Sequence, residues 1–130
     1  MFGTTFRMRP RAGKEQEVVA LFQQWDRERR PRVRGAMGGY LFRPEGRPGE
    51  QVGVAVFSDR EAYFANASDP EQDRWYRRLR ELLGADPEGQ DGEVLAGRGT
   101  ASRTSPSAQP LARGRGQGYA GGVHGRAPLQ

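Results

Sequence analysis

The hydrophobic positions of the first 96 residues include four strand-like stretches. Residues 2–8 alternate between Phe, Thr and Met on one face and Gly, Thr and Arg on the other, which predicts a strand. Residues 35–44 contain a second strand, in which Gly38 and Gly39 indicate a bulge or a close backbone approach. Residues 51–57 place valines on one face and small or apolar residues on the other, as in a strand buried on both sides. Val94 and Leu95 mark a short final strand over residues 91–96.

An apolar stripe at helical spacing predicts a helix over residues 14–30. The stripe consists of Val18, Leu21, Phe22 and Trp25, which follow the i, i+3, i+4, i+7 spacing of one helix face. Pro31 is expected to end this helix, because proline cannot continue the backbone hydrogen bonding.

Two start signals predict two further helical segments after the third strand. Ser58 and Glu61 have the spacing of a capping box, in which each side chain bonds the other residue's amide, so a short helix is expected through about residue 66. Asp69 as N-cap and Pro70 at the first helical position predict the next helix. Gly84 is expected to end it.

The order of these elements is β-α-β-β-α-β, which predicts an α+β, ferredoxin-like fold with helices on one face of an antiparallel sheet. The apolar side chains expected to cover that face are Val18, Leu21, Phe22, Trp25, Trp75 and Leu79. The other face also carries apolar side chains, because the third strand is apolar on both sides. A second copy of the sheet is its simplest cover, so we expect a homodimer that closes into an α+β barrel.

Residues 97–130 lack apolar periodicity and are rich in Gly, Ser, Pro and Arg, so we expect a disordered tail after a domain of residues 1–96. The chain has 21 basic and 16 acidic residues and a net charge of +5. The tail contains no acidic residue, and its five basic residues are Arg98, Arg103, Arg113, Arg115 and Arg126. The domain is therefore near neutral. Weak, salt-dependent nucleic-acid binding is expected only of the tail, with a plain low-complexity extension as the alternative.

Composition excludes several classes of chemistry. There is no Cys, and the single His, His124, lies in the tail, so the domain has no thiol nucleophile, thiolate metal site or Ser-His-Asp triad. No carboxylate motif has metal-ligand spacing, and we expect no metal. No apolar run is long enough for a signal peptide or a membrane span, so we expect a cytoplasmic protein without a membrane partner.

Several segments together carry a family resemblance. They are the strand of residues 2–8, the helix that starts after Gly13 and ends with Trp25 and Arg30-Pro31, the Gly39-Tyr40 strand, and residues 56–63, Val-Phe-Ser-Asp-Arg-Glu-Ala-Tyr. In these segments, residues 1–96 resemble the antibiotic biosynthesis monooxygenase-like domains of the dimeric α+β barrel superfamily. The resemblance implies cofactor-independent oxygenases of polycyclic phenols, haem-degrading enzymes, or members without known activity. The haem-degrading branch uses an Asn, a Trp and a His, so the lack of a domain His disfavours it.

Two functions are consistent with this resemblance. The first is a cofactor-independent monooxygenase acting on an aromatic or polyketide-type substrate. The protein would supply an apolar pocket between sheet and helices, a group that favours the substrate anion, and exclusion of water, with no cofactor expected. The second is a non-catalytic dimeric barrel that binds a small ligand, which the lack of a catalytic His or Cys favours.

Arg7, Tyr40 and Asn66 are the candidate catalytic residues. Arg7 needs a partner or an anionic ligand if it points inward, and it is simply solvated if its strand is an edge. Tyr40 is expected to face the barrel interior, where its hydroxyl needs a partner. Asn66 either caps a helix C-terminus or orients a substrate oxygen.

Trp25, Tyr63 and Trp75 are the candidate substrate-binding residues. Trp25 lies on an apolar stripe, so core packing competes with substrate stacking as its role. Trp75 and Tyr76 point about 100° apart on their helix, so one is expected in the core and the other at a pocket mouth. Tyr63 lies near the break between the two helical segments.

Overall fold

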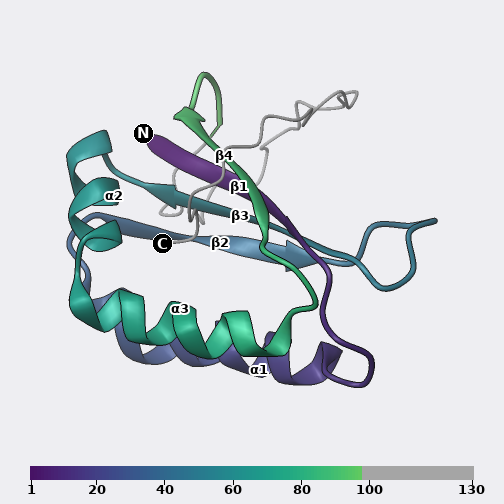
Figure 1. The fold of residues 1–130 in the computed structure, drawn as a ribbon. Helices are drawn as coiled ribbons and strands as arrows, with labels where there is room; N and C mark the ends of the chain where they lie inside the picture. The colour runs from purple at the N-terminus through teal and green to yellow at the C-terminus, as the bar shows by residue number, and fades with distance from the viewer. Residues whose placement is uncertain (98–130) are drawn as a thin grey trace.

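The computed structural model describes residues 1–97, which form a four-stranded antiparallel sheet with helices on one face (Figure 1). The strands are β1 (Phe2–Met8), β2 (Ala36–Phe42), β3 (Gln51–Phe57) and β4 (Glu88–Glu93). The helices are α1 (Glu15–Gln24), α2 (Arg60–Ala67) and α3 (Pro70–Leu82), and a π-helical turn η1 (Trp25–Arg29) and a 3-10 turn η2 (Arg30–Arg32) follow α1. The predicted α+β, ferredoxin-like fold is confirmed, with strand order β2-β3-β1-β4.

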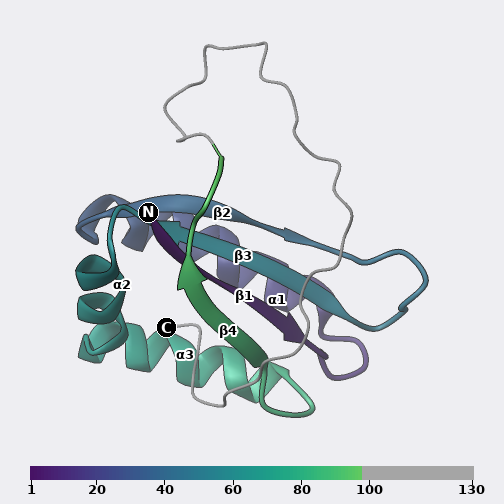
Figure 2. The same cartoon turned by 90° about the horizontal axis from the view of Figure 1, so that it is seen from above.

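Strand pairing determines which side chains face the helices. Phe2 pairs with Phe57, and Phe6 with Gly53; directly opposite residues of an antiparallel ladder project from the same face. The helix-facing set contains Thr4, Phe6 and Met8 of β1, Gln51, Ala55 and Phe57 of β3, and Gly39 and Leu41 of β2. The opposite, open face carries Thr5 and Arg7 of β1, Val52, Val54 and Val56 of β3, and Tyr40 and Phe42 of β2. Figure 2 looks onto the sheet with α1 behind it.

Helices α1 and α3 bury the main core against the sheet. Its buried members are Phe6, Met8, Val18, Leu21, Trp75, Leu79 and Leu83, with Phe22 and Trp25 partly buried against them. The apolar stripe predicted for the helix-covered face is therefore confirmed. A second cluster, formed by Phe57, Ala62 and Tyr63, lies where α2 meets the end of the sheet.

The predicted capping box is wrong by one residue. Asp59, not Ser58, is the N-cap of α2, and its Oδ1 accepts a hydrogen bond from the Ala62 amide at 2.7 Å. The Ser58 amide instead donates to the Gly35 carbonyl at 2.8 Å. Ser58 is thus still held beside the neighbouring strand, and the helix begins only after it.

Both long helices end differently from expectation. After α1 the chain stays helical through η1 and η2, and Pro31 lies inside η2 rather than ending the helix. Pro31 fits there because the first positions of a helical turn need no backbone donor. Helix α3 ends at Leu82, since Leu83 is extended and forms a β-bridge with Pro10.

The last strand is three residues earlier than predicted. β4 runs from Glu88 to Glu93 rather than over residues 91–96, and Leu95 is 90% exposed. Its backbone pairs with β1, from Arg7 opposite Glu88 to Phe2 opposite Glu93. An edge strand that pairs through its backbone needs no apolar pattern. Using Val94 and Leu95 to locate the strand therefore placed it three residues too late.

Both predicted roles for the glycines of β2 are present. The register shifts between Ala36 and Gly38, where Gly38 has a φ of 118°, as expected for a bulge. A Cβ at Gly39 would overlap the Val54 carbonyl oxygen, so the backbones approach closely there. The predicted tail lies outside the described residues from Arg98 onward, as do its arginines and the nucleic-acid binding expected of them.

Candidate functional site

A pocket of about 870 Å³ lies between the sheet and α1. Its sheet side includes Phe6, Leu41, Ala55 and Phe57, all of which belong to the helix-facing set. Its helix side includes Val19, Phe22 and Trp25 of α1 and η1, with Trp75 from α3. Gly39 of the edge strand β2 lines the same wall through its backbone.

Aromatic rings form most of the apolar wall. The Phe6 and Phe22 rings stack at 5.7 Å, and the Phe22 and Trp75 rings meet edge to face at 5.0 Å. Phe57 and Tyr63 make a second edge-to-face pair at 5.4 Å. Such a surface suits a flat, apolar or aromatic ligand, because its rings offer both faces and edges for packing.

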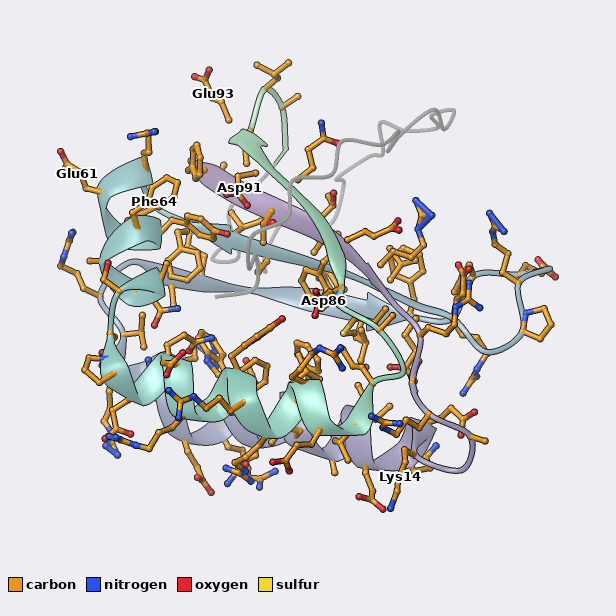
Figure 3. The ribbon with its side chains drawn as sticks, in the orientation of Figure 1. Lys14, Glu61, Phe64, Asp86, Asp91 and Glu93 are labelled. Carbon is orange, nitrogen blue, oxygen red and sulfur yellow. The ribbon has the colours of Figure 1, made fainter. Side chains whose placement is uncertain are left out.

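Polar groups enter this wall at the end of the pocket near α2 and α3. The Trp25 Nε1 donates to Gln72 Oε1 at 2.7 Å, and Gln72 is only 3% exposed. The Tyr63 hydroxyl donates to Asp91 Oδ1 at 2.8 Å. Asp91 and Phe64 are seen at the same end of the sheet in Figure 3. This end of the pocket therefore offers oriented amide and phenol groups inside an otherwise apolar wall.

The π-helical turn η1 begins at the pocket. Trp25 is its first residue, and Asp26 and Arg27 line the rim. Asp26 is engaged by Arg30, whose Nε donates to its Oδ1 at 2.6 Å. Short π-helical turns inside helices occur frequently at functional sites. This one contains Trp25, a predicted substrate-binding residue.

All three predicted substrate-binding residues line the pocket. Trp25, Tyr63 and Trp75 come from three different elements and converge on it. The two roles weighed for Trp25 coexist, because it packs against the main core and also faces the pocket. Of the adjacent pair, Trp75 lies in the core and at the pocket, while Tyr76 packs against the core elsewhere. Burial raises the pKa of the Tyr76 hydroxyl, and the nearby Asp86 raises it further.

The predicted catalytic residues do not converge. Arg7 projects from the open face, away from the pocket, where it lies 3.8 Å from Glu88 of the neighbouring strand. Its strand is not an edge, and its side chain is partly buried. Tyr40 contributes to the pocket lining at β2, but its side chain belongs to the open face and is 80% exposed.

Asn66 is buried below α2 and is not part of the pocket lining. Its Oδ1 accepts a hydrogen bond from Arg29 Nη2 at 2.8 Å. The helix C-cap is Ser68 rather than Asn66, so the capping role weighed for Asn66 is wrong. The amide instead ties η1 to the end of α2.

The pocket residues that sequence reasoning missed include two buried glutamines, Gln51 and Gln72. Each is a polar residue on an otherwise apolar face: Gln51 shares its strand face with Ala55 and Phe57, and Gln72 precedes Trp75 by three positions on α3. Both are buried, at 3% exposure. A glutamine in an apolar stripe is the signal that could have found them, because burying an amide is costly without a partner.

Two classes of site are not seen within residues 1–97. No group of three or more His, Cys, Asp or Glu side chains in that range is arranged to hold a metal ion. Over the same residues, no helix has the length and apolar character needed to cross a membrane.

Comparisons with known proteins agree with this architecture. The antibiotic biosynthesis monooxygenase family model matches residues 1–78. No curated protein matches the chain.

Solved structures share the fold at low sequence identity. SnoaB, a cofactor-independent oxygenase from Streptomyces nogalater, is 18% identical over 74% of this chain and 94% of its own, with a TM-score of 0.61. Rv0793 from Mycobacterium tuberculosis is 18% identical over 74% of this chain and 96% of its own, with a TM-score of 0.62. A Chloroflexus aurantiacus protein assigned to the antibiotic biosynthesis monooxygenases is 20% identical over 75% and 96%, with a TM-score of 0.61. Because the family model covers 78 of the 130 residues, the chain belongs to the antibiotic biosynthesis monooxygenase family.

Proposed function

We propose that this protein is a cofactor-independent monooxygenase that oxidises a small aromatic, polyketide-type substrate in the pocket beneath α1. The observation that carries the proposal is the aromatic wall of that pocket, with a few oriented polar groups at one end. Membership of the family and the similar fold of a cofactor-independent oxygenase support it.

In this chemistry the substrate is the reductant. A phenol or enol loses a proton, and the resulting anion transfers electrons to dioxygen. One oxygen atom enters the substrate as a carbonyl in place of a CH2 group, and the other leaves as water, so the substrate supplies all four electrons. The protein's part is to bind the ring system, exclude water and hold the reacting edge in place.

The pocket residues divide these tasks. Trp25 and Trp75 provide ring surface for the substrate, and their indole N–H groups are held by Gln72 and by the Leu21 carbonyl. The Tyr63 hydroxyl donates its proton to Asp91, so its oxygen can accept a hydrogen bond from the substrate hydroxyl before that group ionises, and we assign it to that contact. Arg7 and Asn66 lie outside the pocket, so neither is retained as a catalytic residue.

Oxygen uptake with a panel of anthrones and naphthols tests the proposal. We expect uptake with at least one member, and Tyr63→Phe should lower kcat/KM about tenfold, the effect of losing the acceptor that positions the substrate hydroxyl. Arg77→Gln, on the exposed side of α3, is the control and should leave the rate unchanged. Absence of uptake across the panel would contradict the proposal. Binding without uptake would favour the alternative, a non-catalytic barrel that holds a small ligand.

We also propose that the protein works as a homodimer whose two open faces meet. Tyr40 is 80% exposed and Phe42 48% exposed on that face, beside three valines of β3. Apolar area of this kind gains about 25 cal/mol per Å² when it is covered. A second copy offers a matching apolar sheet face, which is the simplest cover.

A further inference from the structure

We propose that the end of the pocket nearest the β2–β3 hairpin recognises a hydroxyl and a carboxylate on the same edge of an aromatic ligand. Gln51 would accept a hydrogen bond from the hydroxyl, and Arg43 would bind the carboxylate. The inference rests on the proposed function of the pocket and narrows its substrate class to aromatic hydroxy acids.

Gln51 carries a buried acceptor without a donor. The residue is 3% exposed and lines the pocket. Its Nε2 donates to the Glu15 carbonyl at 3.3 Å. That bond fixes the amide orientation, because the reversed amide would place two oxygens together. The Oε1 is left with less than 1 Å² exposed and no hydrogen-bond partner among residues 1–97. An unpaired buried acceptor is unfavourable, and a ligand donor that meets Oε1 as the side chain turns towards the pocket would remove this cost.

Arg43 places a cation beside this acceptor. It directly follows β2, whose last pair is Phe42 opposite Val52, so continuing this register by one residue would place Arg43 beside Gln51. It also lines the pocket. Cross-strand neighbours have Cβ atoms about 4.5–5.5 Å apart. Both side chains therefore start from adjacent positions at one end of the pocket, and we infer that they meet two groups in a 1,3 relation on one aromatic ring.

The charge of Arg43 is uncommitted within the described part of the chain. Its two neighbours at the hairpin end are engaged by the buried Glu50: Arg9 Nη2 lies 2.9 Å from Oε2, and Arg47 Nε lies 3.8 Å from Oε1. Among residues 1–97, Arg43 makes no ion pair. Within residues 1–97, the one acidic residue that lines the pocket is Asp26, and it is already bonded to Arg30.

The combination of groups selects among ligand classes. A bare anion without a proton, such as sulfate, would satisfy Arg43 but would bring a further acceptor towards Gln51 Oε1. A neutral hydrocarbon would fill the aromatic wall and satisfy neither group. An aromatic acid with a hydroxyl in the 1,3 position supplies a donor, an anion and a ring system together.

Isothermal titration of the full chain with three probes tests the inference. The probes are 4-hydroxy-2-naphthoate, which carries both groups, 2-naphthoate, which lacks the hydroxyl, and 1-naphthol, which lacks the carboxylate. We expect 4-hydroxy-2-naphthoate to bind about tenfold more tightly than 2-naphthoate, since one recovered hydrogen bond of this kind is worth about tenfold.

The variants separate the two contacts. Gln51→Leu should abolish the tenfold preference for the hydroxyl while leaving the Kd of 2-naphthoate unchanged. Arg43→Gln should weaken both acids about tenfold and leave 1-naphthol unaffected. Gln16→Leu and Arg77→Gln, both on exposed helix surfaces outside the pocket, are the matched controls and should change none of the three constants.

Several outcomes would overturn the inference. They are a preference for the hydroxyl that survives in Gln51→Leu, an equal loss of all three probes in Arg43→Gln, and failure of every probe to bind. Gln51→Met serves if the leucine variant does not fold, and the exposed Arg43 supplies an independent arm. Selective binding without oxygen uptake would refute the proposed monooxygenase and leave this site standing. Oxygen uptake together with unselective binding would refute this site and leave the proposed monooxygenase standing.

Discussion

At the scale of single residues, the absence of a side chain shapes the pocket as much as the aromatic rings do. Gly53 is buried in β3 on the helix-facing side, and the Phe6 ring lies directly over it. A Cβ at this position would overlap ring atoms of Phe6. The Phe6 ring, which stacks on Phe22 in the pocket wall, can therefore occupy this position only because residue 53 has no side chain.

Gly53→Ala should accordingly destabilise the fold, by about 1–3 kcal/mol, the usual cost of adding a methyl group to a packed core. Urea unfolding followed by circular dichroism measures the change in free energy. Gly92→Ala on β4 is the matched control, because a Cβ there meets nothing within 4 Å. Equal effects of the two substitutions would mean that Phe6 moves aside freely.

The residues of the candidate site were only partly predictable, for a physical reason. Aromatic residues in apolar stripes identify pocket walls well, as Trp25 and Trp75 show, and Tyr63 was indicated by its place near the break between two helical segments. Candidate polar residues were chosen by their chemistry rather than by the face they occupy. Alternation along β1 already places Arg7 and Phe6 on opposite faces of the sheet. Gln51 lies on the helix-facing side, where the pocket is.

At the scale of elements, the start of α2 depends on one carboxylate. Asp59 has an extended backbone, and its Oδ1 accepts a hydrogen bond from the Ala62 amide. Ser58 Oγ instead points to Asp59 Oδ2 at 3.5 Å and bonds no helix amide within residues 1–97. Both residues are common N-caps, so composition alone cannot choose between them. The strand-side bond from Ser58 to Gly35 decides the choice.

Asp59→Ala should therefore cost about 1 kcal/mol of stability, a typical loss for an N-cap, and Ser58→Ala should cost clearly less. Thermal unfolding of the two variants side by side measures the difference. A larger loss in Ser58→Ala would restore the capping box that the sequence spacing predicts.

β4 shows the limit of hydrophobic patterning for elements. Its sequence, Glu-Gly-Gln-Asp-Gly-Glu, has no apolar residue, yet it pairs along most of β1. The other three strands, which have two neighbours or an apolar face to cover, were located within a residue or two. A polar edge strand is specified by its partner's free backbone groups, and these are invisible in its own pattern.

At the scale of the whole molecule, the order of elements was sufficient to predict the sheet and the side that the helices cover. The helix-covered face can be predicted from short stretches of sequence, because each helix carries its own apolar stripe. What covers the open face is a property of two molecules. It depends on the exposed Tyr40 and Phe42 and on the valines of β3 beside them.

If two open faces meet, full-length protein should have twice the single-chain mass of 14.4 kDa in light scattering at micromolar concentration. Replacing Tyr40 and Phe42 together by Glu should shift the mass to one chain, because like charges would be buried against an apolar surface. Both side chains are exposed in the single chain, so the variant should keep its circular dichroism spectrum. Phe64→Glu, an exposed aromatic on α2 away from that face, is the control and should remain dimeric. A wild-type protein of single-chain mass would show that the open face tolerates solvent, and the paired-sheet arrangement would then be wrong.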